Sequence, residues 1–176
     1  MRRSASTVLV VALACLILFP APAHAGKGKK GGVTVTMARE IPFAESSGAT
    51  SNVKSECTLQ TRLPGFIQDY SKKVNLVLVD EVTEETEGRV LTLEIIGVVG
   101  FGGGAWSGAK NVTVEGTLTE NGEVIGTFVA MRYSGGGAFG GFKGTCSILG
   151  RCIKTLGSDI AKWLAEPRMD AMLGNA

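Results

Sequence analysis

The stretch NVTVEGTLTENGEVIGTFVAMRY, residues 111–133, decides the fold. Apolar and polar residues alternate in residues 111–119 and again in residues 123–133, which is typical of strands that bury one face. Asn121-Gly122 separates the two runs, and this dipeptide is the strongest short signal for a two-residue hairpin turn. The stretch therefore predicts a long antiparallel hairpin.

Three further runs, all earlier in the chain than this hairpin, predict strands. They are RVLTLEIIGVV at residues 89–99, VNLVLV at residues 74–79 and VTVTM at residues 33–37. The second is apolar and β-branched, and the third alternates apolar with polar residues. The acidic residues 80–88 lack the ligand spacing and central glycine of a calcium loop, so we expect a solvated connection there.

Two segments carry apolar residues at helical spacing. The first is CTLQTRLPGFIQDYSKK, residues 57–73, in which Pro64 either starts a turn or kinks the helix. The second covers residues 145–165, with Thr145 placed to cap it and Pro167 placed to stop it. The order β-α-β-β-β-β-α predicts an α+β two-layer sandwich, in which two helices cover one face of a mainly antiparallel sheet of about five strands.

The N-terminal segment has the pattern of a signal peptide. Two arginines precede an apolar run, and Ala23-His24-Ala25 forms an A-x-A cleavage site. Cys15 lies inside the apolar run, where it does not fit a lipoprotein cleavage site, and a twin-arginine signal needs a more specific context. We therefore expect residues 1–25 to direct export by the general secretory route to the periplasm, with no stable membrane insertion after cleavage.

The remainder of the chain is expected to form one domain. Residues 26–32 read GKGKKGG and have nothing to bury, so they are expected as a flexible arm. Residues 33–167 are long enough to build one hydrophobic core. Residues 168–176 are expected as a C-terminal tail.

Removal of the leader changes the balance of charge and removes the only histidine. The chain has 18 basic and 16 acidic residues, and the two arginines of the leader leave 16 of each. Neutrality predicts no nucleic-acid surface. Loss of His24 excludes Ser-His-Asp and Cys-His mechanisms as well as histidine-containing metal sites. We expect neither a metal nor an organic cofactor.

Three cysteines remain in the mature chain, namely Cys57, Cys146 and Cys152. An odd number leaves one thiol over or bonded to another chain. If Cys146 and Cys152 are both helical, they lie about 9 Å apart along the axis, which is too far for a disulfide. We therefore expect Cys57 to bridge to one of them. A three-cysteine metal site would need closer spacing than this.

One glycine-rich pattern occurs twice, as GGGAWSGAK at residues 102–110 and GGGAFGGFK at residues 135–143. Neither copy is a phosphate-binding P-loop, because its lysine comes one place late. In a meander, both copies leave the sheet at the same end, beside the start of the last helix. Their aromatic and ammonium groups would then suit an anionic or peptide ligand. The residues of this predicted site are Trp106, Lys110, Phe139, Lys143 and Thr145.

The alternative explanation of the repeat is structural. In it, the glycines only let the strand ends bulge, the aromatic rings fold over the edge of the core, and the lysines are solvated.

Three runs resemble uncharacterised bacterial envelope proteins, which are small exported or lipid-anchored α+β domains. The runs are SGAKNVTVEGTLTENGEVIGTF, GGGAFGGFKGTCSILGRC and LGSDIAKWL. The shared features are glycine-rich loops at strand ends and a C-terminal helix with the pattern D-I-A-x-W-L. The resemblance implies an envelope location and an α+β fold, and it implies no activity.

No set of nucleophile, base and orienting residue can be assembled from the sequence. We therefore expect an exported, non-enzymatic periplasmic protein that acts as a binding or envelope-associated accessory module. Its partner would be another envelope protein or a small anionic or peptide ligand. The alternative is a histidine-independent hydrolase that uses serine and lysine or paired carboxylates. A closed cleft with a serine within hydrogen-bond reach of Lys110 or Lys143 would favour that alternative.

Overall fold

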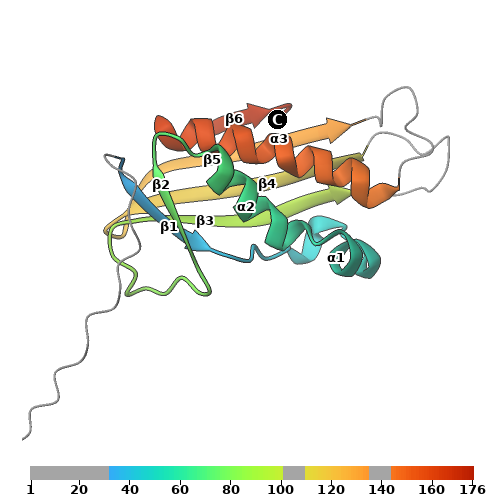
Figure 1. The fold of residues 1–176 in the computed structure, drawn as a ribbon, viewed down its shortest axis with the longest axis horizontal. Coiled ribbons are helices and arrows are strands. Elements are labelled where there is room, and N and C mark those ends of the chain that lie inside the picture. The colour runs from blue at the N-terminus through green and yellow to red at the C-terminus, as the bar shows by residue number, and fades with distance from the viewer. Residues whose placement is uncertain (1–31, 101–109, 135–143) are drawn as a thin grey trace, which may run out of the picture.

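The computed structural model describes residues 32–100, 110–134 and 144–176. The predicted leader, all but the last residue of the basic arm, and the two glycine-rich copies apart from Lys110 lie outside the described residues. The described chain folds into two layers, a six-stranded sheet and a layer of helices (Figure 1). This is the predicted α+β sandwich.

The predicted hairpin forms the centre of the sheet. It consists of β4 (Lys110–Glu120) and β5 (Glu123–Ser134), which pair antiparallel along their length. Asn121 and Gly122 in the turn have φ values of 51° and 87°. Both lie in the left-handed region, which a two-residue type I′ turn requires. On its other side, β4 pairs antiparallel with β3 (Arg89–Val99), so the three strands form the expected meander.

Parallel strands extend the meander on both sides. β1 (Thr34–Ala38) pairs with β3 and with β2 (Asn75–Val79), and β6 (Ala171–Gly174) pairs with β5. The sheet order is therefore β2-β1-β3-β4-β5-β6.

The expectation of a C-terminal tail at residues 168–176 was wrong, because this segment contains the sixth strand. β6 is only four residues long, so its alternation of buried and exposed side chains is too short to identify a strand in the sequence.

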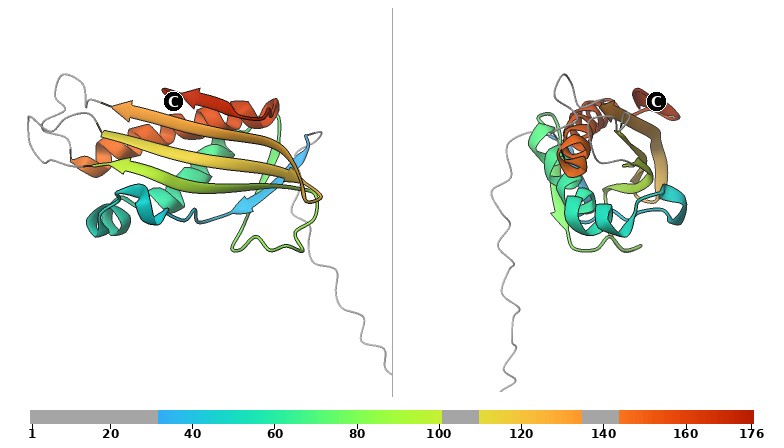
Figure 2. Two further views of the ribbon diagram at one scale, coloured as in Figure 1. Left: turned by 180° about the vertical axis from the view of Figure 1, so that it is seen from behind. Right: turned by 90° about the vertical axis from the view of Figure 1, so that its right-hand side faces the viewer.

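Two long helices cover one face of the sheet and lie behind its strands in the left view of Figure 2. α2 (Leu59–Tyr70) and α3 (Thr145–Ala165) are the two predicted helices, and α3 has the predicted bounds. α1 (Ser51–Cys57) was not predicted. The hydroxyl of Thr50 caps this short helix by accepting the Val53 N–H at 3.3 Å.

Pro64 lies inside α2 and changes the hydrogen-bond partner of one backbone carbonyl. Proline has no N–H to donate to the carbonyl four residues earlier, which belongs to Gln60. That carbonyl instead accepts the N–H of Ile41 at 3.1 Å. The proline therefore leaves an acceptor that fixes the segment after β1 against the helix layer.

The core lies between the helices and the inner face of the sheet. Trp163 of α3 is 4% exposed and meets the ring of Phe128 edge-on, with ring centroids 4.7 Å apart. α2 and α3 approach so closely that a Cβ added at Gly157 would lie 2.6 Å from the Cβ of Phe66. The tight contact explains why glycine stands in the middle of α3.

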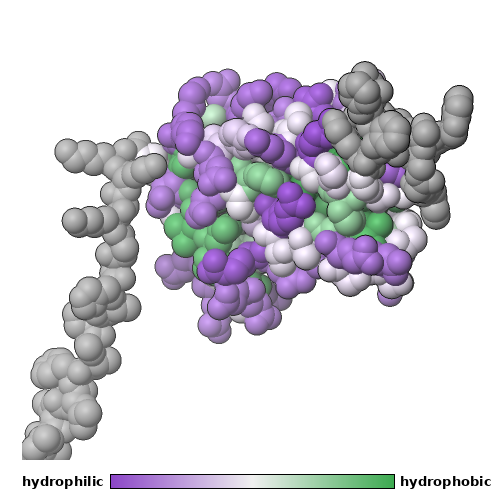
Figure 3. All heavy atoms as spheres, turned by 45° about the vertical axis from the view of Figure 1, so that its right-hand side comes forward, coloured by the Kyte–Doolittle hydropathy of each residue, from purple (hydrophilic) through white to green (hydrophobic). Residues whose placement is uncertain are grey.

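Side chains occupy the outer edge of β2. Gln68 Nε2 donates to the Leu76 carbonyl at 2.9 Å, and Arg39 Nη2 donates to the Leu78 carbonyl at 3.2 Å. These contacts satisfy two acceptors that an edge strand otherwise presents to another chain. Apolar residues also reach the surface, in patches bordered by hydrophilic residues (Figure 3).

Candidate functional site

The ends that flank both glycine-rich copies lie together at one end of the sheet. β3 ends at Val99, β4 begins at Lys110, β5 ends at Ser134 and α3 begins at Thr145, all toward the right of Figure 1. The strand register agrees, because Asn111 pairs with both Val99 and Tyr133. The structure therefore brings Lys110 and Thr145 to the same end. The other predicted site residues, Trp106, Phe139 and Lys143, lie outside the described residues.

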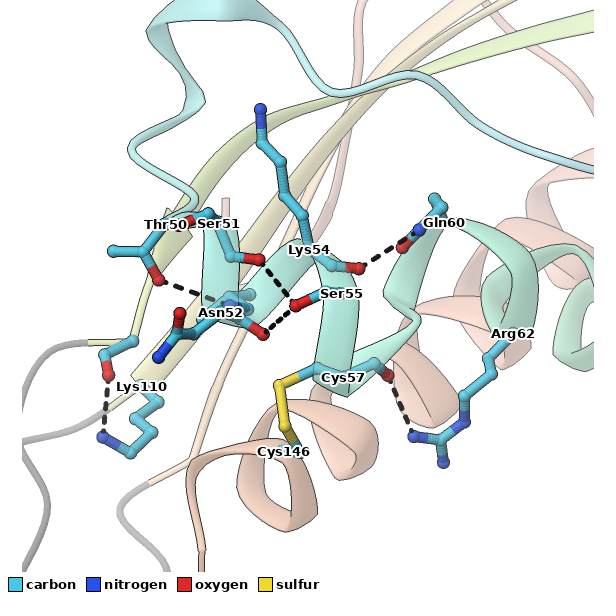
Figure 4. Close-up of a disulfide and its surroundings, with 12 residues drawn as sticks. Thr50, Ser51, Asn52, Lys54, Ser55, Cys57, Gln60, Arg62, Lys110 and Cys146 are labelled. Carbon is cyan, nitrogen blue, oxygen red and sulfur yellow. Dashed lines mark hydrogen bonds between the residues drawn. A yellow bond between two sulfur atoms is a disulfide. The ribbon is translucent and has the colours of Figure 1, made fainter.

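A disulfide closes this end of the molecule (Figure 4). It joins Cys57, the last residue of α1, to Cys146, the second residue of α3, with the two Cα atoms 4.7 Å apart. This is the predicted bridge from Cys57 to one of the two later cysteines. It holds α1 against the first turn of α3.

Arg62 strengthens the junction between the three helices. Its Nη1 donates to the Cys57 carbonyl at 3.4 Å, and its guanidinium lies 5.8 Å from the centroid of the Phe66 ring. A Cβ at Gly150 of α3 would lie 3.2 Å from the same guanidinium. A cation at the C-terminal end of α1 also complements the helix dipole.

Lys110 is a buried residue of this end. Its side chain is 1% exposed, and its Nζ donates to the Gly100 carbonyl at 3.4 Å (Figure 4). The structural explanation of the repeat predicted solvated lysines, and this prediction is wrong for Lys110. Its inward position follows from strand alternation, because Val112 and Val114 on the same face of β4 are also buried.

Cys152 remains a free thiol and is buried against β4. Its Sγ lies 3.7 Å from the Lys110 carbonyl oxygen, to which it donates a weak hydrogen bond. Burial raises the pKa of the Cys152 thiol, and the charge of Arg151 opposes this effect only in part. A thiol with a raised pKa and little exposure is not an activated nucleophile.

A groove of about 210 Å³ lies between α1 and the start of α3. Gly100 at the end of β3 belongs to its lining, and a Cβ there would lie 3.3 Å from a Val53 methyl group and 3.5 Å from the Thr145 methyl group. Glycine thus lets the strand end approach both helices. The helix residues that line the groove are Asn52, Val53, Glu56, Cys57, Thr145 and Cys146.

The start of α3 presents backbone donors at this groove. Thr145 was expected as the cap, but it is the first helical residue, and the N-cap is Gly144, which has no side chain. The N–H groups of Ser147 and Ile148 donate to the Gly144 carbonyl. The N–H groups of Thr145 and Cys146 come too early in the helix to have a helical carbonyl as acceptor. The helix therefore leaves them available to an anion.

The groove also contains a side-chain amide and a carboxylate. Asn52 and Glu56 are both exposed residues of α1. The combination of backbone donors at α3 with a carboxylate across the groove suits a ligand that carries both an acceptor and a donor, as a peptide terminus does.

Neither a metal-binding group nor a membrane-spanning helix is found in the described chain. Among residues 32–100, 110–134 and 144–176, no three histidine, cysteine, aspartate or glutamate side chains are arranged to hold a metal ion. Over the same residues, no helix combines the length and the apolar composition needed to cross a bilayer.

Comparison with known proteins finds likeness only at the level of structure. No protein-family model and no curated protein matches the sequence. A homologue of a neuraminyllactose-binding hemagglutinin from Helicobacter pylori has 12% identity and a TM-score of 0.47, over 83% of this chain and 90% of that one. PelC from Paraburkholderia phytofirmans, solved as a dodecamer, has 14% identity and a TM-score of 0.46, over 77% and 92%.

A third similar structure is a protein from Xanthomonas campestris, with 8% identity and a TM-score of 0.48 over 79% of this chain and 87% of that one. At these identities and TM-scores, none of the three supports a conclusion about function.

Proposed function

We propose that this protein is an exported, non-enzymatic binding module of the bacterial envelope. Its ligand site is the groove at the disulfide-closed end of the sheet. The observation that carries the proposal is the meeting of the uncapped start of α3, at Thr145 and Cys146, with Glu56 across one groove. The ligand is the C-terminal end of a peptide, whose carboxylate is bound by the helix start and whose N–H groups donate to Glu56.

Export is supported by two independent features. The first is the A-x-A leader pattern at residues 1–25. The second is the Cys57–Cys146 disulfide, because such bonds form and persist in oxidising compartments such as the periplasm. The partner that presents the peptide end is then another envelope protein.

The glycine-rich copies contribute to the same site in this proposal. In the chain, Trp106 lies between Gly100 and Lys110, while Phe139 and Lys143 lie between Ser134 and Gly144. All of these flanking residues belong to the end of the sheet that carries the groove. The aromatic side chains would bind an apolar residue of the ligand, and the Lys143 ammonium would add attraction for its carboxylate.

The hydrolase alternative has one specific observation in its favour. Lys110 and Ser134 are direct partners in the register of β4 and β5, and such partners have Cβ atoms about 5 Å apart. Neither residue lines the groove, however. A serine-reactive fluorophosphonate probe that labels the protein at Ser134, but not the Ser134→Ala variant, would establish the alternative.

The proposed site is tested by calorimetric titration with the acetylated tripeptide Ac-Ala-Ala-Phe, as its free acid and as its amide. We expect the acid to bind and the amide to bind at least about tenfold more weakly, because a charge-assisted hydrogen bond contributes about 1.5–3 kcal/mol. Equal binding of the two forms would refute recognition of the carboxylate.

A matched pair of variants isolates the backbone donor. Thr145→Pro removes one N–H, yet proline is favoured at the first helical position, and Gly144 already has the extended backbone that precedes a proline. Thr145→Ala keeps that N–H. We expect only the proline variant to lose about tenfold in affinity for the acid.

A further inference from the structure

A second cavity lies where the pairing of β1 with β3 is interrupted. The two strands are in register from Val35 and Arg89 to Met37 and Leu91. The next point of contact is a parallel bridge between Phe43 and Ile95. The segment after β1 therefore uses six residues where β3 uses four, and the extra residues loop away from the sheet.

Backbone hydrogen bonds fix both sides of this interruption. Ile95 donates to the Pro42 carbonyl at 2.9 Å and accepts the Ala44 N–H at 3.0 Å. The Ile41 N–H is turned to α2, where it donates to the Gln60 carbonyl that Pro64 leaves available. Backbone hydrogen bonds therefore fix the chain at both ends of the opening.

The backbone N–H and C=O groups of Leu93 in β3 face the opening. Alternate residues of a strand direct their N–H and C=O groups to the same side. Because the groups of Ile95 point toward Pro42 and Ala44, those of Leu93 point toward the same side, and the register gives Leu93 no partner there. An extended chain placed in the opening would find a donor and an acceptor.

The cavity at this position has a volume of about 330 Å³, an apolar interior and an acidic rim. Ile41 and Leu91 contribute apolar surface, while Glu40, Asp80 and Glu81 contribute carboxylates. None of the residues that line it is a lysine or an arginine. Arg39, which lies nearby, is occupied by Asp80 at 3.1 Å and by the Leu78 carbonyl.

We propose that this cavity binds an extended basic peptide segment, in which one residue pairs with the Leu93 backbone and carries its lysine or arginine side chain to Glu40 and Glu81. The aliphatic stem of such a side chain covers the apolar interior while its charge reaches the carboxylates at the rim. Glu84, Glu85 and Glu87, which follow Glu81 in the same connection, are also exposed carboxylates. They attract a basic segment from a distance.

This site is independent of the groove beside the disulfide, and none of its peptides has a free C-terminal carboxylate. The probe is the blocked peptide Ac-Ala-Ala-Arg-Ala-Ala-NH2, titrated into the full mature chain and followed by backbone amide NMR and calorimetry. Two matched peptides replace the arginine by neutral citrulline or by glutamate.

We expect the arginine peptide to bind, to shift the Leu93 amide signal, and to bind more tightly than either matched peptide. Glu40→Gln and Glu81→Gln should each weaken binding about two- to fivefold, which corresponds to an exposed ion pair. The control Asp170→Asn removes an exposed carboxylate just before β6, at the opposite edge of the sheet from β2, and should leave the affinity unchanged. The spectrum of each free variant shows that it is folded.

Three results would overturn the proposal. They are the absence of binding at millimolar arginine peptide, equal binding of the citrulline or glutamate peptide, and shifts that leave the Leu93 amide in place.

Discussion

Cys57 and Cys146, which are separated by 89 positions in the sequence, are bonded so that the last residue of α1 and the first turn of α3 line the same groove. Without the bond, α1 is a seven-residue helix, which is too short to be stable by itself. The disulfide therefore determines both the stability of this end and the shape of its groove.

The first prediction concerns this bond. Replacing Cys57 and Cys146 together by alanine should lower the free energy of unfolding by up to about 4–5 kcal/mol, because the reduced chain no longer has a long loop closed in the unfolded state. Chemical denaturation followed by circular dichroism measures the change. Cys152→Ala is the control, since it keeps the bond and removes only a small buried group. A double variant as stable as this control would contradict the prediction.

The second prediction compares two helical glycines. Gly157→Ala should destabilise the protein by about 1–3 kcal/mol, because the new methyl group would overlap Phe66 where α2 meets α3. Gly65→Ala on α2 has nothing within 4 Å of the new Cβ and should stabilise by about 0.5–1 kcal/mol. Thermal unfolding of both variants gives the two signs, and equal shifts would show that the helix contact is looser than described.

The third prediction concerns the edge strand β2. Removing both Gln68 and Arg39 side chains by alanine substitution frees the carbonyls of Leu76 and Leu78 to pair with another chain. We expect the double variant to self-associate in a concentration-dependent way, as measured by light scattering after size-exclusion chromatography. Lys72→Ala, which removes an exposed charge just before β2, is the control. A monomeric double variant at all concentrations would mean that these side chains do not protect the edge.

The fourth prediction concerns the ion pair between β5 and α3. Arg132 Nε donates to the Asp159 carboxylate at 2.7 Å, and the two side chains are 28% and 12% exposed. Asp159→Asn should cost about 1–3 kcal/mol of unfolding free energy, because a charge-assisted bond becomes a neutral one in a partly buried place.

The pH dependence of that pair has a definite sign on the arginine side. The hydrogen bond that Arg132 donates to the Asp159 carboxylate raises the pKa of Arg132 from a value that is already far above neutral. A raised pKa contributes stability that is lost only as the pH rises through it. The arginine therefore stays charged across neutral pH, and its titration should cause no change in stability between about pH 6 and about pH 9.

Much of the fold could be predicted because its main elements are long and regular. Asn121-Gly122 and the alternation on both sides of it predicted the central hairpin, and the apolar face of residues 145–165 predicted α3 with its bounds. β6 and α1 were missed. Each is short and is held mainly by tertiary contacts, β6 by β5 and α1 by the disulfide, so neither leaves a periodic pattern in the sequence.

The candidate site was predicted less completely. The meander correctly brought Lys110 and Thr145 to one end, but the burial of Lys110 depends on which face of β4 meets the helices. The choice of Cys146 over Cys152 depends on how α1 packs, and the sequence did not indicate that α1 is a helix. The cavity beside Leu93 lies where the pairing of β1 with β3 is interrupted, and the hydrogen bond from Ile41 to the Gln60 carbonyl at this point is visible only once α2 and Ile41 are placed together.

The central claim, recognition of a peptide carboxylate at the start of α3, is tested most directly by backbone amide NMR during titration with Ac-Ala-Ala-Phe. The account predicts that the Thr145 and Cys146 amide signals shift downfield and saturate together with the free acid, and that they stay in place with the peptide amide. Shifts that are the same for both peptides, or that leave these two signals unmoved while others saturate, would contradict it.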